Sequence, residues 1–362
     1  MTLVSVVSRF IRLYVLSTEM MILVAFIFLL YNFIPYIPLW KFMRSARVKM
    51  QVKLSGQNGT VPNGKKIGVE KTIDSVFEDK ERASWELKGE NVGVFAIQGR
   101  RPHMEDRFNV VSDLENTGTS IYGMFDGHGG EFAAEFVEKT LVKSLMVRLL
   151  QAENGHTVDS AGRMLTDQVL EVDRQLLQIA RSTMPVEISG TTSLVAMVRN
   201  STLTVANTGD SRGVICDKYG KMIPLSFDHK PHQIKERLRI QQAGGFISFN
   251  GVWRVGGVLA TSRAMGDLPL KDKHFLIADP DILTFDLDEL DPKFMILATD
   301  GLWDYFSNEE AVEFVSERLS EPHFGAKSLV LQAYYRGSLD NITVMVVDFH
   351  NNRTSQYNKK SR

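Results

Sequence analysis

Three aspartates stand at the ends of apolar runs that are typical of buried strands. Asp126 follows the run 121–125, Asp300 follows 294–299, and Asp340 precedes 342–347. Taken singly, an aspartate beside a strand usually marks a turn. Taken together, these aspartates would crowd carboxylates at one edge of a sheet, where they repel one another and raise each other's pKa. Such a cluster favours a bound cation.

The donor atoms indicate which cation would suit this edge. Carboxylate oxygens are hard ligands that suit Mg²⁺ or Mn²⁺. Zinc is less suited, because no set of histidines and cysteines has the spacing of zinc ligands. Gly127 and the pair Gly129-Gly130 let the backbone come close, so that a main-chain carbonyl could join the carboxylates. Further acids stand in polar motifs: Glu105, Asp106 and Asp210.

Other kinds of chemistry find little support in the sequence. Thiol phosphatases need an arginine shortly after the cysteine, and residues 217–222 after Cys216 contain none. A single cysteine also excludes a disulfide within the chain. No serine nucleophile with a partner base is evident. The formal net charge of −1 gives no support to a nucleic-acid partner.

The elements that must position the aspartates can be predicted from the hydrophobic pattern. Apolar runs between turn signals predict strands at 92–97, 121–125, 192–198, 203–206, 213–216, 294–299 and 342–347. Helical periodicity appears at 131–150, 158–181, 233–243, 309–319 and 326–335. Several strands are apolar throughout, as expected when both faces of a sheet are covered. Long helices between groups of strands predict a layered α+β domain.

The amino-terminal run 20–40 is apolar except for Asn32, and it is about as long as the ~20 residues that cross a bilayer. We interpret it as a single-pass transmembrane helix, although a hairpin broken at its prolines stays open. A cleaved signal peptide would need small residues where Trp40 and Lys41 stand. A buried helix would be expected to have a polar face.

The charges around this run predict its orientation. Five cations between Lys41 and Lys53 follow the run, and only Arg9 and Arg12 precede it. The positive-inside rule therefore places the large carboxy-terminal part in the cytosol. The marginal length of the run favours a thin membrane, such as that of the endoplasmic reticulum.

The chain thus divides into five parts. We expect a short segment at 1–19, a transmembrane helix at 20–40, a basic juxtamembrane stretch and linker at 41–90, a catalytic domain at 91–350 and a loose tail at 351–362.

Eight short motifs in 92–349 resemble those of the metal-dependent protein phosphatases, the type 2C Ser/Thr phosphatase family. They are Arg101-Pro102-His103-Met104-Glu105-Asp106, Phe125-Asp126-Gly127-His128-Gly129-Gly130, Ser189-Gly190-Thr191-Thr192, Gly209-Asp210-Ser211-Arg212, Asp228-His229-Lys230-Pro231, Thr261-Ser262-Arg263-Ala264-Met265-Gly266-Asp267, Asp300-Gly301-Leu302-Trp303-Asp304 and Asp340-Asn341-Ile342-Thr343. The resemblance implies a four-layer α/β/β/α sandwich of two antiparallel sheets flanked by helices, with a binuclear metal centre at one end.

The resemblance also implies roles for particular residues. It assigns two Mg²⁺ or Mn²⁺ ions to Asp126, the carbonyl of Gly127, Asp300 and Asp340, and a weaker third ion to Asp210 and Asp304. Arg101 would hold the substrate phosphate, His128 would protonate the leaving oxygen, and Glu105 would act near the metals through water. Supporting positions around them are Asp106, Thr191, Asp267 and Asn341. Asp304 could instead cap the helix expected near Glu309.

The resemblance implies hydrolysis of phosphoserine and phosphothreonine in proteins. The stretch 231–253 corresponds to a flap beside the site that is linked to substrate choice, and Trp253 and Trp303 are expected to be packing residues. Phosphorylated proteins, stress-activated protein kinases among them, and the lipid bilayer are the implied partners. Two alternatives stay open: a catalytically silent membrane-tethered scaffold that binds phosphoproteins, and an enzyme for small phosphoesters.

Overall fold

The computed structural model describes residues 83–153, 160–183 and 186–349. The predicted segments 1–19 and 20–40 and the tail 351–362 lie outside these residues, as does most of the predicted linker 41–90. Within the described ranges, no helix combines the length and apolar character that a membrane span requires.

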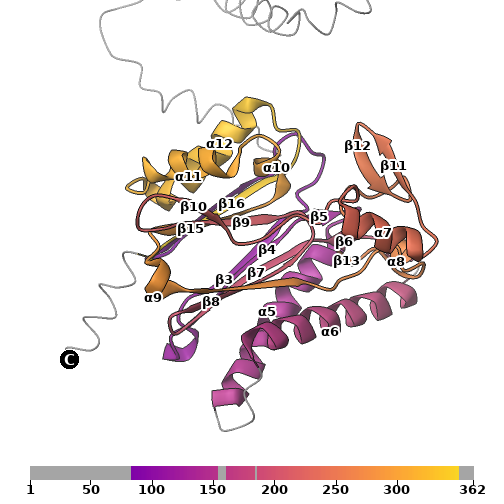
Figure 1. Ribbon diagram of the computed structural model, residues 1–362, viewed down its shortest axis with the longest axis horizontal. Coiled ribbons are helices and arrows are strands. Elements are labelled where there is room, and N and C mark those ends of the chain that lie inside the picture. Colours follow the sequence, from indigo (N-terminus) through magenta and orange to yellow (C-terminus); the bar gives the residue numbers. More distant parts are fainter. Residues whose placement is uncertain (1–82, 154–159, 184–185, 350–362) are drawn as a thin grey trace, which may run out of the picture. The chain divides into compact units, whose positions relative to one another are not determined.

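Two antiparallel sheets lie face to face in the middle of the domain (Figure 1). The first sheet has the order β1 (Ser84–Lys88), β2 (Val92–Ile97), β16 (Ile342–Asp348), β15 (Phe294–Ala298), β9 (Arg212–Cys216) and β10 (Met222–Pro224). The second has the order β14 (Asp281–Asp286), β8 (Thr202–Thr208), β7 (Ser193–Arg199), β4 (Thr119–Phe125) and β3 (Arg107–Val111), with the short 3₁₀ turn η3 (Leu114–Asn116) before β4.

Helices cover the outer face of each sheet (Figure 1). The first sheet carries α10 (Asp300–Trp303), α11 (Asn308–Ser316), η4 (Pro322–Gly325) and α12 (Ala326–Arg336). The second carries α5 (Phe132–Glu153) and α6 (Ala161–Ser182). The short α9 (Leu287–Leu290) follows β14. The predicted α+β architecture, two antiparallel sheets flanked by helices, is therefore confirmed.

Three hydrophobic layers explain why the central strands are apolar throughout. Successive side chains of a strand point to opposite faces, and in β2 Val94 lies in the core between the sheets while its neighbour Phe95 packs under the carboxy-terminal helices. In β4, Tyr122 likewise faces the central core and Ile121 faces α5 and α6. Each central strand is thus buried on both sides.

The predicted linker was wrong at its carboxy-terminal end. β1 lies within 41–90 and pairs with β2 along its whole length. Its burial alternates between exposed and half-buried, which is typical of an edge strand. Trp85 is held there by the Arg107 guanidinium, which lies 4.7 Å from the centre of its ring. Such a short, half-exposed strand has no apolar run that would identify it in the sequence.

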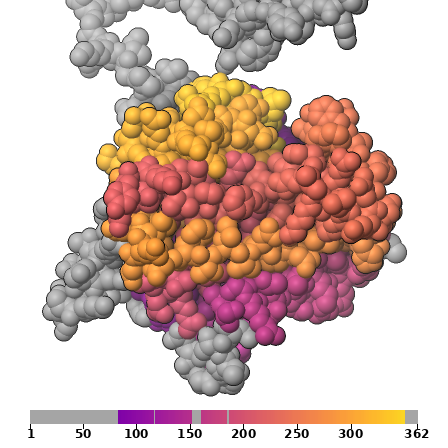
Figure 2. All heavy atoms as spheres, in the orientation of Figure 1, coloured from indigo at the N-terminus to yellow at the C-terminus, as the bar shows by residue number. Residues whose placement is uncertain are grey.

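One end of the sandwich carries small elements that matter for the site. A three-stranded sheet of β13 (Met265–Gly266), β6 (Gly190–Thr191) and β5 (Gly127–His128) extends from it. Beside it lie α8 (Leu268–Lys271) and the flap, which consists of α7 (Ile234–Gln242) and the hairpin β11 (Ile247–Asn250) and β12 (Val252–Val255). Figure 2 shows the hairpin end of the flap projecting at the upper right edge of the domain, with a notch between it and the yellow carboxy-terminal helices.

Candidate metal and phosphate site

Asp126 stands between the last residue of β4 and the first residue of β5. Its backbone is fixed on both sides by Thr191, which ends β6, and Thr192, which directly precedes β7. The carbonyl of Asp126 accepts hydrogen bonds from the Thr192 amide at 2.9 Å and from the Thr191 hydroxyl at 3.1 Å. The Asp126 amide in turn donates to the Thr192 hydroxyl at 3.1 Å. Thr191, predicted as a supporting position, therefore orients the backbone that carries the central carboxylate.

Glu105 approaches the same place from the loop before β3. Its amide donates to Asn341 Oδ1 at 2.8 Å, and its Oε1 accepts from the Gly130 amide at 2.7 Å. The buried Asn341 also donates to the carbonyls of Gln98 and His103 at 2.8 and 2.9 Å. A side chain at Gly127 would overlap the Glu105 carbonyl oxygen, so only glycine allows this approach.

Asp300 and Asp340 reach the site from the other sheet. Asp300 begins α10 after the single residue Thr299 that follows β15, and its amide donates to Asp126 Oδ2 at 3.4 Å. Asp340 precedes β16, and its Oδ2 accepts from Arg101 Nη2 at 2.5 Å. Three predicted metal ligands from distant parts of the sequence therefore meet at one end of the sandwich.

Asp106 connects the segment before Asp300 to strand β16 through hydrogen bonds. Its Oδ2 accepts hydrogen bonds from the Thr299 hydroxyl at 2.9 Å and from the Thr343 hydroxyl at 2.6 Å. Thr299 directly precedes Asp300, and Thr343 lies in β16, three positions after Asp340. Burial raises the pKa of Asp106 to about 7, although the hydrogen bonds from both threonines counteract the rise. Asp106 therefore links the segments that carry Asp300 and Asp340.

The cluster contains more acidic side chains than cations. Burial, followed by the charge of Asp300, raises the pKa of Asp126 well above its ordinary value. Burial, followed by the charges of Asp210 and Asp340, does the same to the pKa of Asp300. The cations that face these acids are Arg101 and Lys230, whose Nζ lies 2.6 Å from Asp210 Oδ2. The acids outnumber the cations, so the site favours added positive charge.

This donor set fits divalent cations. Its oxygen donors are carboxylates with a backbone carbonyl nearby, and their mutual repulsion is the cost that a bound Mg²⁺ or Mn²⁺ would remove. Among the described residues, however, no three acidic, histidine or cysteine side chains already close around a common point. A physical reason is that Arg101 and Lys230 each draw one carboxylate into an ion pair.

His128 and Asp267 form a close pair beside this cluster. The imidazole Nε2 lies 2.7 Å from Asp267 Oδ2. Burial alone would lower the pKa of His128, but the charge and hydrogen bond of Asp267 outweigh it, so the pKa is raised. The two predicted positions are therefore partners, and a protonated imidazole at this place is the form that can donate a proton.

Asp304 lies at the carboxy-terminal end of α10, where burial raises its pKa although the charge of Lys230 counteracts the rise. It does not cap the next helix: Ser307 caps α11 and forms a capping box with Glu310. The alternative reading of Asp304 as a helix cap is therefore wrong. Asp304 and Asp210 both lie close enough to Asp300 for their charges to raise its pKa.

Sequence reasoning quoted Lys230 and Arg212 in motifs but gave them no role. Lys230 is the ion-pair partner of Asp210, twenty positions away in the chain. Arg212 makes a two-pronged contact with Asp228 at 2.8 and 2.7 Å and lies over the Trp303 ring. The indole of Trp303 donates to the carbonyls of Arg212 and Ala298, so this tryptophan packs as expected. Trp253 is 39% exposed on the flap and packs edge to face against Phe249, with ring centroids 5.4 Å apart.

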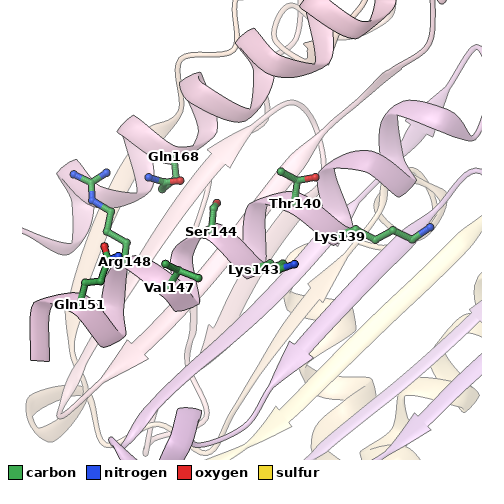
Figure 3. A pocket seen from close by; sticks show the side chains of 8 residues that line it. All are labelled: Lys139, Thr140, Lys143, Ser144, Val147, Arg148, Gln151 and Gln168. Atoms are coloured by element: carbon green, nitrogen blue, oxygen red, sulfur yellow. The ribbon is translucent and has the colours of Figure 1, made fainter. Parts of the chain in front are cut away.

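A separate groove of about 750 Å³ runs along α5, as Figure 3 shows. Its lining side chains come from α5 and, at Gln168, from α6. None of them belongs to the carboxylate cluster. We assign no role to this groove.

Comparisons with known proteins point to one family. A family profile described as "Protein phosphatase 2C" matches residues 90–342. The chain is 50% identical over 364 residues to "Protein phosphatase 1L" of Bos taurus, covering 98% of both chains. It is 42% identical over 258 residues to "Probable protein phosphatase 2C 59" of Arabidopsis thaliana, covering 71% of this chain and 79% of that relative.

Among solved structures, a serine-threonine phosphatase 2C from Toxoplasma gondii is similar, with a TM-score of 0.64 and 26% identity. The match covers 74% of this chain and 99% of that one.

Proposed function

The chain belongs to the protein phosphatase 2C family and is a protein serine/threonine phosphatase, and we propose that its carboxylate cluster makes it dependent on Mg²⁺ or Mn²⁺. The observation that carries this proposal is the meeting of Asp126, Asp300 and Asp340 from three strand ends, with too few cations to balance them. An enzyme that hydrolyses phosphate monoesters must overcome one of the slowest uncatalysed reactions.

The residues that would hold two ions are Asp126, the Gly127 carbonyl, Asp300 and Asp340, with a weaker third at Asp210 and Asp304. When bound, such ions supply an activated water and neutralise phosphate charge. The half-exposed Arg101 uses one nitrogen for Asp340, so its remaining donors suit the substrate phosphate oxygens. Glu105 is held near the cluster by Asn341 and Gly130.

Phosphate release from a phosphothreonine peptide tests this proposal directly. The protein is first stripped with a chelator and then assayed with and without added Mn²⁺. We expect release only with the metal. Binding of the phosphopeptide without any release would support the silent scaffold instead, and equal release in both assays would contradict metal dependence.

His128 should matter most when the leaving group needs a proton. We expect His128→Ala to lower kcat for a phosphothreonine peptide by about a hundredfold, because general acid catalysis is worth roughly 10²–10⁴-fold. Turnover of p-nitrophenyl phosphate should change much less, because its leaving group departs without a proton. The exposed His274, changed to asparagine, is the control. Equal losses on both substrates would remove His128 as the acid.

The flap supports a protein substrate rather than a small phosphoester. Ile234, Leu238, Phe249 and Trp253 are all exposed on it, and Ile234 is 79% exposed. The single acid in 231–253 is Glu236, which is buried. A surface that is both apolar and basic complements a polypeptide with acidic and apolar residues around its phosphate.

This reading of the flap predicts a preference among peptides. With Lys235→Glu and Arg237→Glu together, kcat/KM for a phosphopeptide with acidic flanks should fall by up to about fivefold per charge at low salt, since exposed charge pairs are worth about 0.2–1 kcal/mol. Turnover of p-nitrophenyl phosphate serves as the internal control and should not change. Unchanged peptide selectivity would exclude the flap charges from recognition.

We further propose that residues 20–40 tether the enzyme to a membrane, with the catalytic domain in the cytosol. The support is the apolar run and its basic carboxy-terminal flank. The marginal length of the run supports the endoplasmic reticulum. Family resemblance alone supports stress-activated protein kinases as substrates.

Fractionation of cells tests the tether. The full chain should stay in the membrane pellet after alkaline carbonate extraction, whereas a variant without 20–40 should be released with unchanged turnover of p-nitrophenyl phosphate. Asn200 is an exposed glycan acceptor on the turn after β7, so a glycan there would reverse the proposed orientation. Release of the full chain by carbonate would rule out a span.

A further inference from the structure

A buried ion pair joins α6 to α8 away from the carboxylate cluster. Asp173 Oδ2 lies 2.6 Å from Lys271 Nζ, and both side chains are at most a tenth exposed. The other oxygen, Oδ1, accepts from the Gly266 amide at 2.8 Å. One carboxylate therefore holds both ends of the segment 266–271. The proposed reaction uses neither Asp173 nor Lys271.

This segment cannot hold its own shape. α8 has four residues, and a helix of one turn has little stability by itself. Asp267, which precedes it, has φ 55° and ψ 48°, a left-handed conformation that is unfavourable for a residue other than glycine. The Asp267 amide donates to the Ser189 carbonyl at 3.0 Å. Its side chain does not cap α8, and instead turns to His128.

The small sheet fixes the place where Asp267 meets His128. Gly190 in β6 pairs with His128 on one side and with Gly266 on the other. A side chain at Gly190 would overlap the Asp267 carboxylate and would come within 2.5 Å of His128 Nε2. The imidazole and the carboxylate thus lie directly over the Gly190 backbone. A small shift of the 266–271 segment would therefore separate them.

We propose that Asp173 and Lys271 are positioning residues of the phosphatase reaction. By holding 266–271 from α6, they aim Asp267 at Nε2 of His128, which fixes the imidazole ring and leaves Nδ1 as the ring nitrogen available to the substrate. This inference rests on the proposed role of His128 as the acid. It adds a path of contacts that begins on a helix outside the site.

The variant that tests it replaces both charges, Asp173→Asn with Lys271→Met, so that no unpaired charge is left buried. The asparagine can still accept from Gly266. We expect kcat for a phosphothreonine peptide to fall by about tenfold, as is common when a supporting contact of a site is lost. Turnover of p-nitrophenyl phosphate should fall less than about twofold, and KM should not change for either substrate.

Two comparisons separate positioning from a general loss of structure. In a His128→Ala background the double variant should cause no further loss, because it acts only through the imidazole. The control is Arg181→Gln with Asp272→Asn, which removes an exposed pair that also joins α6 to the α8 region, at 2.7 Å. That control should leave both substrates unchanged.

Several outcomes would contradict the proposed positioning role of Asp173 and Lys271. Equal losses on both substrates, losses that add to those of His128→Ala, or unchanged peptide turnover would each overturn the positioning role. If the double variant does not fold, Lys271→Gln, whose amide can still donate to Asp173, should show a smaller difference of the same kind. If His128→Ala lowers turnover of both substrates equally, His128 is not the acid, and the positioning role is refuted as well. If only the Asp173 and Lys271 variants fail to behave as expected, the positioning role alone is refuted.

Discussion

Replacing Asp300 by asparagine should abolish metal-dependent phosphate release and should also make the metal-free protein more stable. The two effects have one cause. Burial and neighbouring charges raise the pKa of Asp300 and of Asp126 well above ordinary values. An ionised carboxylate in this place is therefore unfavourable without a cation, although the reaction needs it.

The sign of the stability change follows from the pKa direction. A carboxyl whose folded-state pKa lies above its unfolded value stabilises the fold at low pH, and this contribution is lost as the pH rises through the folded pKa. Near neutral pH the metal-free protein thus carries the cost of the repulsion, and Asp300→Asn removes part of it. At a gain of about 1 kcal/mol, the Tm of a domain of this size should rise by about 2–4 °C.

The measurements are phosphate release with saturating Mn²⁺ and thermal unfolding after chelation. We expect release to fall by more than about a hundredfold, since even indirect contacts to a metal are worth 10–100-fold. Glu317→Gln, in an exposed ion pair with Arg318, should change neither quantity. A variant with near-normal turnover, or with a lower Tm without metal, would contradict the assignment of Asp300.

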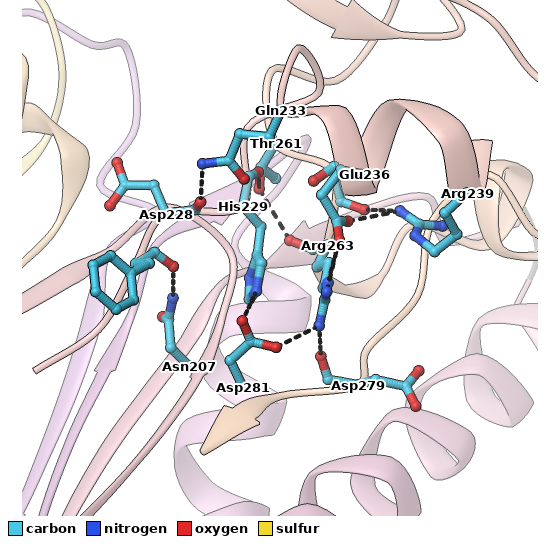
Figure 4. Close-up of polar contacts among 12 residues, drawn as sticks. Asn207, Asp228, His229, Gln233, Glu236, Arg239, Thr261, Arg263, Asp279 and Asp281 are labelled. Carbon is cyan, nitrogen blue, oxygen red and sulfur yellow. Dashed lines mark hydrogen bonds and ion pairs between the residues drawn. The ribbon is translucent and has the colours of Figure 1, made fainter. Parts of the chain in front are cut away.

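Arg263→Met should cause the largest loss of stability among single changes outside the site. Figure 4 shows the polar network around this residue. Its guanidinium binds Glu236 Oε1 at 2.6 Å and Asp281 Oδ1 at 3.0 Å, and both Arg263 and Glu236 are buried. Glu236 belongs to α7, so this network fastens the flap to the rest of the domain.

The cost of this variant comes from the carboxylate that it leaves behind. Removing one partner of a buried ion pair typically costs 3–5 kcal/mol. Arg239 also pairs with Glu236, at 3.1 Å, so we expect a loss near the lower end, about 3 kcal/mol. Chemical denaturation measures it. Arg174→Met, which breaks an exposed Arg–Glu pair, should leave the unfolding midpoint in place. Equal losses of stability in Arg263→Met and Arg174→Met would contradict the argument that burial makes the Arg263–Glu236 pair costly to break.

The pH dependence of stability gives a second readout of the same network. Burial alone would raise the pKa of Glu236, but the hydrogen bond and charge of Arg263, followed by those of Arg239, lower it to about 2. A lowered pKa contributes stability above the unfolded value of about 4.5, which is lost as the pH falls toward 2. Arg263→Met should therefore weaken the loss of stability between pH 4.5 and 2.

The central strands could be predicted because burial on both faces leaves a continuous apolar run. β2, β15 and β16 are fully buried, and the predicted ranges for them nearly coincide with the observed ones. The edge strands β1 and β14 were not predicted, because none of their side chains is fully buried. Partial burial makes a weak sequence signal.

The acids at the strand ends and the motifs of the family can be read from the sequence alone, because both are local patterns that the chain carries in any conformation. The ion-pair partners depend on the folded chain: Arg101 meets Asp340 across 239 positions, and Asp173 meets Lys271 across 98. Such pairs form only when two sheets and their helices bring remote segments together, and their energies depend on burial. No local pattern encodes which cation a buried carboxylate will meet.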